Sequence, residues 1–241
     1  MIPKIIHYCW FGKKDLSPLA SKCIDSWKAF LPDYEIMRWD ETTFNVDSFL
    51  YTKQAYKEKK FAYVSDVVRL YALSRFGGIY MDTDVEVIRP FDEILKNESF
   101  TGFEDNITIT TATIGCSVKS KWIQDLLDSY IDKSFYDDDN NPVLIPNPNL
   151  FTDYLVSKGL VNNNTFQIVE DYISIYPSSF FSPKSHETGI INIDSDTYSI
   201  HHFSGSWLSK RRKILNRIKY FLVSVTGENF FKKLKNIYKT V

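Results

Sequence analysis

Short apolar runs and longer amphipathic segments alternate along the first part of the chain. Residues 2–11 are mostly apolar and lead into a polar loop, a pattern typical of a buried strand. Ser17-Pro18 places a capping residue before a proline, which predicts a helix from there to about residue 30. Residues 34–39 alternate as a second strand. Strand, helix and strand at this short spacing predict an α/β sheet.

A further helix and the strand after it are the centre of the pattern. Residues 61–76 predict a helix, and Gly77-Gly78 predicts its end. The β-branched and aromatic side chains of residues 77–87 predict a strand. Side chains alternate along a strand, so one face is expected to carry Tyr80, Asp82, Asp84 and Glu86.

Two carboxylates on one face of an otherwise apolar strand repel each other and lose solvation. A hard divalent cation removes both costs, because oxygen ligands suit Mg²⁺ and Mn²⁺. Asp82 and Asp84 are therefore candidate metal ligands. A half-exposed strand with a polar solvent side is the alternative explanation.

The rest of the chain carries weaker patterns. Residues 108–118 are rich in β-formers, a helix is expected over 122–130 and another over 149–156, and one or two strands over 166–176. The acidic run at 137–142 is typical of a solvated turn. We find no internal repeat and no linker long enough to separate independent domains.

Two further features are candidates for the site. Asp66 and Arg69 are three residues apart and share one side of the helix predicted over 61–76, either as a surface ion pair or as a pair that faces the aspartates. His201 and His202 follow a strand-like run, and neighbouring side chains on a strand point in opposite directions, so only one of them can face a given site. An imidazole is a plausible third ligand for a metal held by two aspartates.

The chain changes character after Trp207. Apolar residues recur at helical spacing through 214–225 and again through 230–238, and basic residues fill most of the other positions. Residues 208–241 carry a net charge of +9, so the body carries −10. Basic amphipathic helices of this kind suit an anionic membrane surface, and helices docked on the acidic body are the rival explanation. No basic patch extends into the body, so nucleic acid is not an expected partner.

Composition sets the expected setting. Three cysteines with no Cys-x-x-Cys pair predict buried free thiols in a reducing compartment. No signal peptide is recognised at the start, and no apolar run is long enough to span a bilayer. A cytoplasmic protein, peripheral on the inner face of the cell membrane, is the resulting expectation.

Four separated segments resemble the family 32 glycosyltransferases, the Asp-x-Asp sugar transferases of capsule and polysaccharide synthesis and of yeast mannosylation. These segments are residues 2–12, 62–69, 77–84 and 201–207. The chain is more distantly similar to the glucosyltransferase domain of clostridial toxins and to family 8 galactosyltransferases. The resemblance implies a GT-A fold: a single α/β domain over residues 1–207 with a central mixed sheet flanked by helices. The basic helical tail, 208–241, lies outside it.

The resemblance also assigns roles to residues. Asp66 and Arg69 match a pair that grips the donor sugar, and Asp82 and Asp84 match the metal-binding Asp-x-Asp, so these four form the expected catalytic set. His202 matches the last metal ligand, although Gly205 stands where the toxins have a further serine ligand. The donor-binding residues that the resemblance implies are Trp10 under the nucleotide base, Tyr80, Asn149 by a loose alignment, and Trp207 over the diphosphate.

The expected reaction is retaining transfer of a sugar from a nucleotide diphosphate sugar, with UDP favoured and Mn²⁺ or Mg²⁺ as cofactor, to a glycan acceptor on a lipid carrier. Two other functions remain open. A phosphohydrolase of the haloacid-dehalogenase type also uses Asp-x-Asp, but Glu86 stands where that motif needs Thr or Val. A non-catalytic membrane adaptor would use the basic tail alone. Donor sugar, linkage and oligomeric state cannot be read from the residues.

Overall fold

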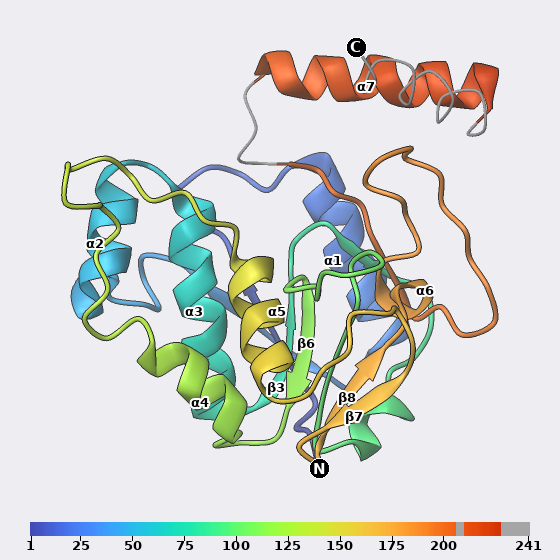
Figure 1. Ribbon diagram of the computed structural model, residues 1–241. Coiled ribbons are helices and arrows are strands. Elements are labelled where there is room, and N and C mark those ends of the chain that lie inside the picture. Colours follow the sequence, from blue (N-terminus) through green and yellow to red (C-terminus); the bar gives the residue numbers. More distant parts are fainter. Residues whose placement is uncertain (206–209, 228–241) are drawn as a thin grey trace.

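The computed structural model describes residues 1–205 and 210–227, and a seven-stranded mixed sheet forms its centre (Figure 1). The strands of this sheet run in the order β2-β1-β3-β6-β5-β8-β7. Their bounds are β1 Ile5–Cys9, β2 Glu35–Trp39, β3 Gly78–Met81, β5 Ser99–Gly102, β6 Thr113–Cys116, β7 Gln167–Val169 and β8 Ile173–Tyr176. β1 is parallel to β2 and β3, whereas β6 lies antiparallel between β3 and β5. The predicted α/β class with a mixed sheet is confirmed.

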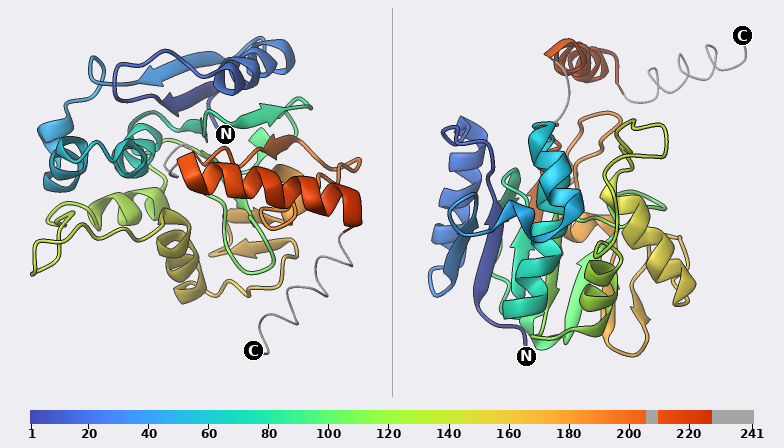
Figure 2. Two further views of the ribbon diagram at one scale, coloured as in Figure 1. Left: turned by 90° about the horizontal axis from the view of Figure 1, so that it is seen from above. Right: turned by 90° about the vertical axis from the view of Figure 1, so that its left-hand side faces the viewer.

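Helices cover both faces of this sheet (Figures 1 and 2). Their bounds are α1 Pro18–Phe30, α2 Leu50–Lys57, α3 Phe61–Phe76, α4 Lys121–Asp128, α5 Asn147–Ser157, α6 Ser178–Phe181 and α7 Lys210–Thr226. One hydrophobic core lies between the sheet and the group α2 to α5, and a second lies between the sheet and α1 with α6. The sheet is therefore buried on both faces, as its apolar strands require.

The first unit forms as its sequence predicts. The Ser17 hydroxyl accepts a hydrogen bond from the Ala20 amide at 3.1 Å, and Pro18 occupies the first helical position. α1 then buries Trp27, whose indole donates to the carbonyl of Val85 at 2.8 Å. This contact ties α1 to the segment that follows the two aspartates.

Gly77 makes the turn from α3 into β3 possible. Its backbone has φ 60° and ψ −155°, a conformation that is essentially restricted to glycine. A Cβ there would also lie 2.8 Å from the backbone nitrogen of Val118. The conformation of Gly77 therefore sets the direction of β3, the strand that leads to the Asp-x-Asp.

Gly77→Ala should accordingly lower the free energy of unfolding by about 2–4 kcal/mol, from backbone strain and the backbone clash together. Denaturant melts would measure the loss. Gly159→Ala is the matched control, because Gly159 also has a positive φ, of +100°, but has no atom within 4 Å of an added Cβ. Equal losses in the two variants would show that the close contact at Gly77 contributes nothing.

The strand predicted over 77–87 is interrupted, which corrects the expectation of one continuous strand. β3 ends at Met81, and β4 (Val85–Val87) leaves the main sheet to pair with β9 (Ser199–His201) in a separate two-stranded sheet. The amide of Val85 donates to the carbonyl of Asp82 at 3.0 Å, closing a turn. Asp82 and Asp84 therefore project from a turn between two sheets.

Other boundaries differ by a few residues. β6 takes only part of the β-rich run at 108–118, and α5 starts two residues before the expected helix. The three cysteines are buried and free, as predicted. α7 confirms the first amphipathic segment of the tail, whereas the second lies outside the described residues. The domain boundary at 207 also falls outside them and stays a prediction.

Candidate functional site

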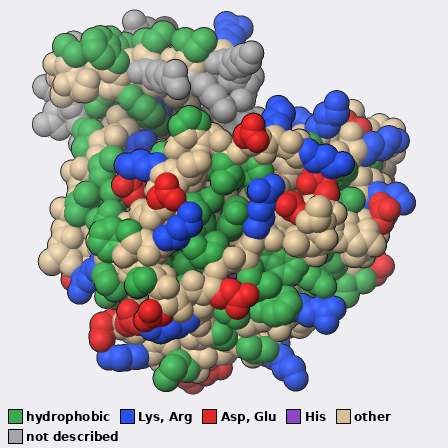
Figure 3. Space-filling model, turned by 180° about the vertical axis from the view of Figure 1, so that it is seen from behind, with side chains coloured by type: hydrophobic (Ala, Val, Ile, Leu, Met, Phe, Trp, Pro, Cys, Tyr) green, Lys and Arg blue, Asp and Glu red, His purple; other side chains and the backbone are tan. Residues whose placement is uncertain are grey.

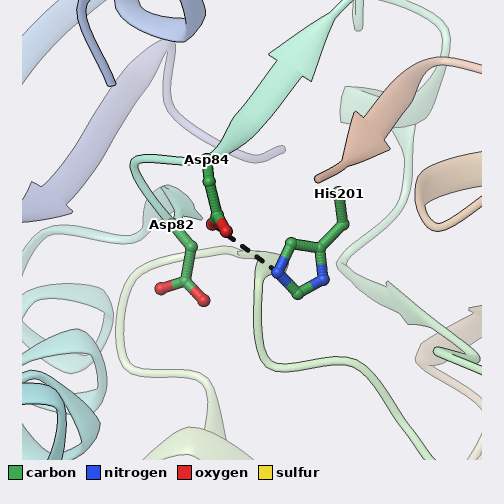
Figure 4. Close-up of side chains that lie close together, drawn as sticks. All are labelled: Asp82, Asp84 and His201. Atoms are coloured by element: carbon green, nitrogen blue, oxygen red, sulfur yellow. Dashed lines mark ion pairs between the residues drawn. The ribbon is translucent and has the colours of Figure 1, made fainter. Parts of the chain in front are cut away.

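Three side chains from two distant segments converge just beyond the carboxyl end of β3 (Figure 4). Asp82, Asp84 and His201 each offer one ligand atom, and these atoms lie within 4.8 Å of one another. His201 comes from β9, whose residues pair with those of β4, so the second sheet carries the imidazole to the turn. Two carboxylates and an imidazole form a donor set that suits Mn²⁺, and a single ion could bind all three.

Asp82 is held by two neighbours. The Tyr80 hydroxyl donates to its Oδ1 at 2.8 Å, and Arg69 Nη2 lies 3.5 Å from the same oxygen. The guanidinium also stands over the Tyr80 ring, 4.7 Å from its centroid. Since both partners use Oδ1, the other carboxylate oxygen of Asp82 has neither of these contacts.

Asp84 is more enclosed than Asp82. Its Oδ2 accepts a hydrogen bond from the Ser204 amide at 2.7 Å, and its Oδ1 lies 3.6 Å from His201 Nε2. Burial alone would raise the pKa of Asp84, but the charge of His201 and these hydrogen bonds outweigh it and hold that pKa well below its usual range. The same pairing outweighs burial at His201 and raises the pKa of its imidazole to about 9.

His202, the expected third metal ligand, does not lie in this cluster, where the structure places its neighbour His201 instead. The Nε2 of His202 lies 2.7 Å from Glu86, and Lys22 binds the same carboxylate oxygen. Glu86 is opposite Ile200 in the β4–β9 pair, so His202 is its diagonal neighbour on one face. His201 points to the other face, and Asp84 reaches it because the turn releases Asp84 from the alternation of the strand.

Asp66 and Arg69 face the aspartates, as one of the two explanations predicted. Arg69 is buried on α3, where its Nη2 pairs with Asp66 at 3.0 Å and its Nη1 donates to the carbonyl of Thr111 at 2.7 Å. One guanidinium therefore connects Asp66 to Asp82. A surface ion pair is excluded, because the side chain of Arg69 is only 6% exposed.

Burial raises the pKa of Asp66 to about 6, and Arg69 only partly offsets this effect. The folded protein therefore holds the Asp66 proton at a higher pH than the unfolded chain, whose reference value is 3.8. By linkage, this group lowers the free energy of unfolding as the pH rises from about 4 to about 6.

Asp66→Asn should remove that dependence. We expect the stability of the wild type relative to the variant to fall across this pH interval, by at most about 3 kcal/mol, and then to level off. Urea melts of both proteins at a series of pH values would measure the difference. A relative stability that increases with pH would mean that Arg69 dominates and that the carboxyl pKa is depressed.

Asn147 is a site residue that the sequence did not single out. It lies at the start of α5, is 3% exposed, and lies close enough to Asp66 to lower the pKa of that carboxyl. Its Oδ1 accepts from the Tyr130 hydroxyl at 3.2 Å. Asn149 was expected here, but it is exposed. Residues two apart on a helix point about 200° apart, so Asn149 faces away from Asp66.

The remaining donor-site candidates have different positions. Trp10 follows β1, the neighbour of β3, and is half-buried with its indole donating to the carbonyl of Lys14 at 2.7 Å. Tyr80 is buried and acts on Asp82. Trp207 lies outside the described residues.

Comparison with known sequences agrees with this arrangement. Residues 17–101 match the family described as the glycosyltransferase sugar-binding region containing a DXD motif. The matched range includes Asp66, Arg69 and both aspartates of the turn. It excludes His201 and Trp10, whose places in the site come from the fold.

Two curated proteins are similar to parts of the chain. The chain is 46% identical over 46 residues, 19% of its length, to Glucan organizing enzyme 1 of Cryptococcus neoformans var. grubii. It is 29% identical over 123 residues, 44% of its length, to Inositol phosphoceramide mannosyltransferase 3 of Schizosaccharomyces pombe. These matches cover 13% and 32% of the relatives, so the chain spans well under two thirds of either protein.

A solved structure shares the fold. The PaToxG glycosyltransferase superposes with a TM-score of 0.51 at 22% sequence identity, over 66% of this chain and 69% of that one. The predicted GT-A fold is confirmed. Its Asp-x-Asp, on the turn after β3, lies within the stretch 17–101, over which the chain is similar to the glycosyltransferases that carry a DXD-containing sugar-binding region.

Proposed function

We propose that the protein transfers a sugar from a nucleotide diphosphate sugar to a glycan acceptor, with a divalent cation, Mn²⁺ or Mg²⁺, as cofactor. The observation that carries this proposal is the convergence of Asp82, Asp84 and His201 beside the Asp66–Arg69 pair. The donor set suits Mn²⁺ better than Mg²⁺, because imidazole is a softer ligand than water or carboxylate.

Asp82, Asp84 and His201 would hold the ion. Bound there, it would supply positive charge to the diphosphate as that group leaves. Arg69 and Tyr80 keep Asp82 in place through its Oδ1, and the Ser204 amide keeps Asp84 in place through its Oδ2. These contacts fix the carboxylates before substrate binds, which lowers the reorganisation that the reaction requires.

Asp66 and Asn147 are the groups suited to hold the hydroxyls of the donor sugar. One is a buried carboxylate, and the other is a buried amide whose Nδ2 has no hydrogen-bond partner among the described residues. Sugar hydroxyls would satisfy both. Trp10 at the end of β1 would stack on the nucleotide base, and the resemblance to bacterial relatives favours uracil.

In the proposed reaction the bond from the anomeric carbon to the diphosphate oxygen breaks, and a bond to the acceptor oxygen forms on the same face. The acceptor proton passes to a diphosphate oxygen. The retained configuration follows from the family resemblance. Cell-surface polysaccharide synthesis, with an acceptor on a lipid carrier, is the setting we propose.

The test is a screen of UDP- and GDP-sugars for nucleotide release with and without Mn²⁺. The proposal expects release from one class of donor only, and loss of that release in excess chelator. An aryl phosphate assay tests the phosphohydrolase alternative. Turnover of the aryl phosphate without any nucleotide release would overturn the proposal. Calorimetry with UDP and Mn²⁺ that gives no heat would favour an adaptor.

A further inference from the structure

α7 presents a row of apolar side chains to solvent. The row repeats every three or four residues along this 17-residue helix and is about half exposed or more at each position: Ile214 57%, Leu215 54%, Ile218 50%, Phe221 66%, Leu222 48% and Val225 67%. Hydrophobic side chains line the outer side of the helix, away from the body of the protein (Figure 3). We call these six residues the apolar row.

The opposite side of α7 holds the helix on the protein. Val223 is 2% exposed, and the ring of Tyr220 covers Gly189 so closely that a Cβ there would lie 2.7 Å from it. The Tyr220 hydroxyl donates to the carbonyl of His186 at 3.1 Å. Val223 and Phe221 are about 200° apart around the helix, so packing on the body does not account for the apolar row.

Charge indicates what the row contacts. The α7 sequence has six Lys and Arg residues and no acidic residue, and four of the basic residues occupy its first turn at 210–213. Exposed apolar surface combined with basic residues on one helix matches the interface of an anionic bilayer. Among the described residues, no helix is long and apolar enough to cross a membrane.

We propose that the apolar row of α7 is a lipid-docking surface that lies in the headgroup region of an anionic bilayer, parallel to its plane. The proposal does not rest on the transferase activity, because the row and its charges are independent of the metal-ligand cluster.

Docking would also orient the candidate active site. The segment under α7 reaches the site through two contacts: His186 lies against Phe203, whose ring centroid is 4.0 Å from that of His201, and Lys184 donates to the carbonyl of His202 at 2.7 Å. The segment that carries Lys184 and His186 therefore contacts both α7 and the residues beside the metal-ligand cluster. A bilayer bound to the apolar row would therefore hold the cluster in one orientation relative to the membrane, as transfer to a lipid-linked acceptor would require.

Vesicle sedimentation of the full chain tests the proposal. The probes are phosphatidylcholine vesicles with and without about one third phosphatidylglycerol. We expect binding to the anionic vesicles, and weaker binding as salt screens the basic residues. Phe221→Glu should lower the partition coefficient by about tenfold or more, because it replaces a buried aromatic group with a charge in the interface. Val161→Glu is the matched control, since Val161 is 59% exposed outside α7, and it should bind as the wild type does.

If something other than a bilayer covers the apolar row, different results are expected. If residues 228–241 cover it, Phe221→Glu should lower the melting temperature as a core substitution would. If a second copy covers it, the variant should change the oligomeric state in light scattering. Either result with unchanged vesicle binding overturns the proposal. So does equal binding to neutral vesicles, or no binding by the wild type. Tenfold weaker binding with an unchanged melting temperature supports it.

Discussion

Asp84→Asn is expected to abolish sugar transfer that depends on a divalent cation. The amide keeps an oxygen for the Ser204 hydrogen bond but removes the negative charge that Asp84 offers to a cation and to His201. Loss of one preorganised electrostatic contact at a reacting group costs about 10²–10³ in rate, and a metal-binding carboxylate should cost at least as much. The measurement is nucleotide release at saturating donor and Mn²⁺.

Glu86→Gln is the matched control for this variant. Glu86 lies two residues further along and is also partly buried, but its partners are Lys22 and His202. We expect activity within a few-fold of the wild type. The circular dichroism spectrum and a cooperative melt establish that both variants are folded. Full activity in Asp84→Asn, or equal losses in the two variants, would contradict the assignment of Asp84.

The two histidines give the second large effect. His201→Ala should weaken Mn²⁺ binding by at least about 100-fold, because even residues that only support metal ligands contribute 10–100-fold to affinity. Binding can be followed by titration of the free protein, without any donor or acceptor. The charge of His201 also offsets that of Asp84, so its loss removes a positive charge from beside that carboxylate.

His202→Ala provides the comparison. This imidazole contacts Glu86 and is adjacent to His201 in the sequence, so the two substitutions disturb the same strand end. Only the alanine at 201 should affect the metal. If His202→Ala weakens Mn²⁺ binding as much as His201→Ala does, the geometry of the turn is wrong and the ligand implied by family resemblance is correct.

Local signals predicted much of the fold. Ser17-Pro18 located the start of α1, and Gly77-Gly78 located the end of α3. Helix caps and left-handed turns depend on the identity of only one or two residues. The three-residue spacing of Asp66 and Arg69 placed both on one side of a helix. Such features need no knowledge of distant segments.

The rest depends on contacts between distant segments. The insertion of β6 between β3 and β5 is a pairing choice that no local pattern specifies. The interruption of the strand after Met81 depends on the pairing of β4 with β9, which lies more than 100 residues later in the sequence. That break decides which histidine faces Asp84, so the sequence singled out both aspartates of the cluster but favoured His202 over His201. Asn147 shows the same limit, since a difference of two residues in the start of α5 decides which asparagine lies near Asp66.

Buried charge concentrates where the donor is proposed to bind. Asp66, Arg69 and His201 are each less than 10% exposed. Buried ionic groups contribute little net stability and are expensive to leave unpaired. Their arrangement is easier to explain by function than by stability, and the expected rise in relative stability of Asp66→Asn at neutral pH follows from this view.

We propose that Asp82, Asp84 and His201 hold one divalent cation against the diphosphate of the donor. Pulsed electron paramagnetic resonance of the protein with Mn²⁺ and UDP examines this directly. We expect a nitrogen coupling from an imidazole, which is lost in His201→Ala and kept in His202→Ala, together with a phosphorus coupling from the nucleotide. Mn²⁺ bound with UDP but without any nitrogen coupling, or UDP bound tightly with no Mn²⁺ at all, would contradict it.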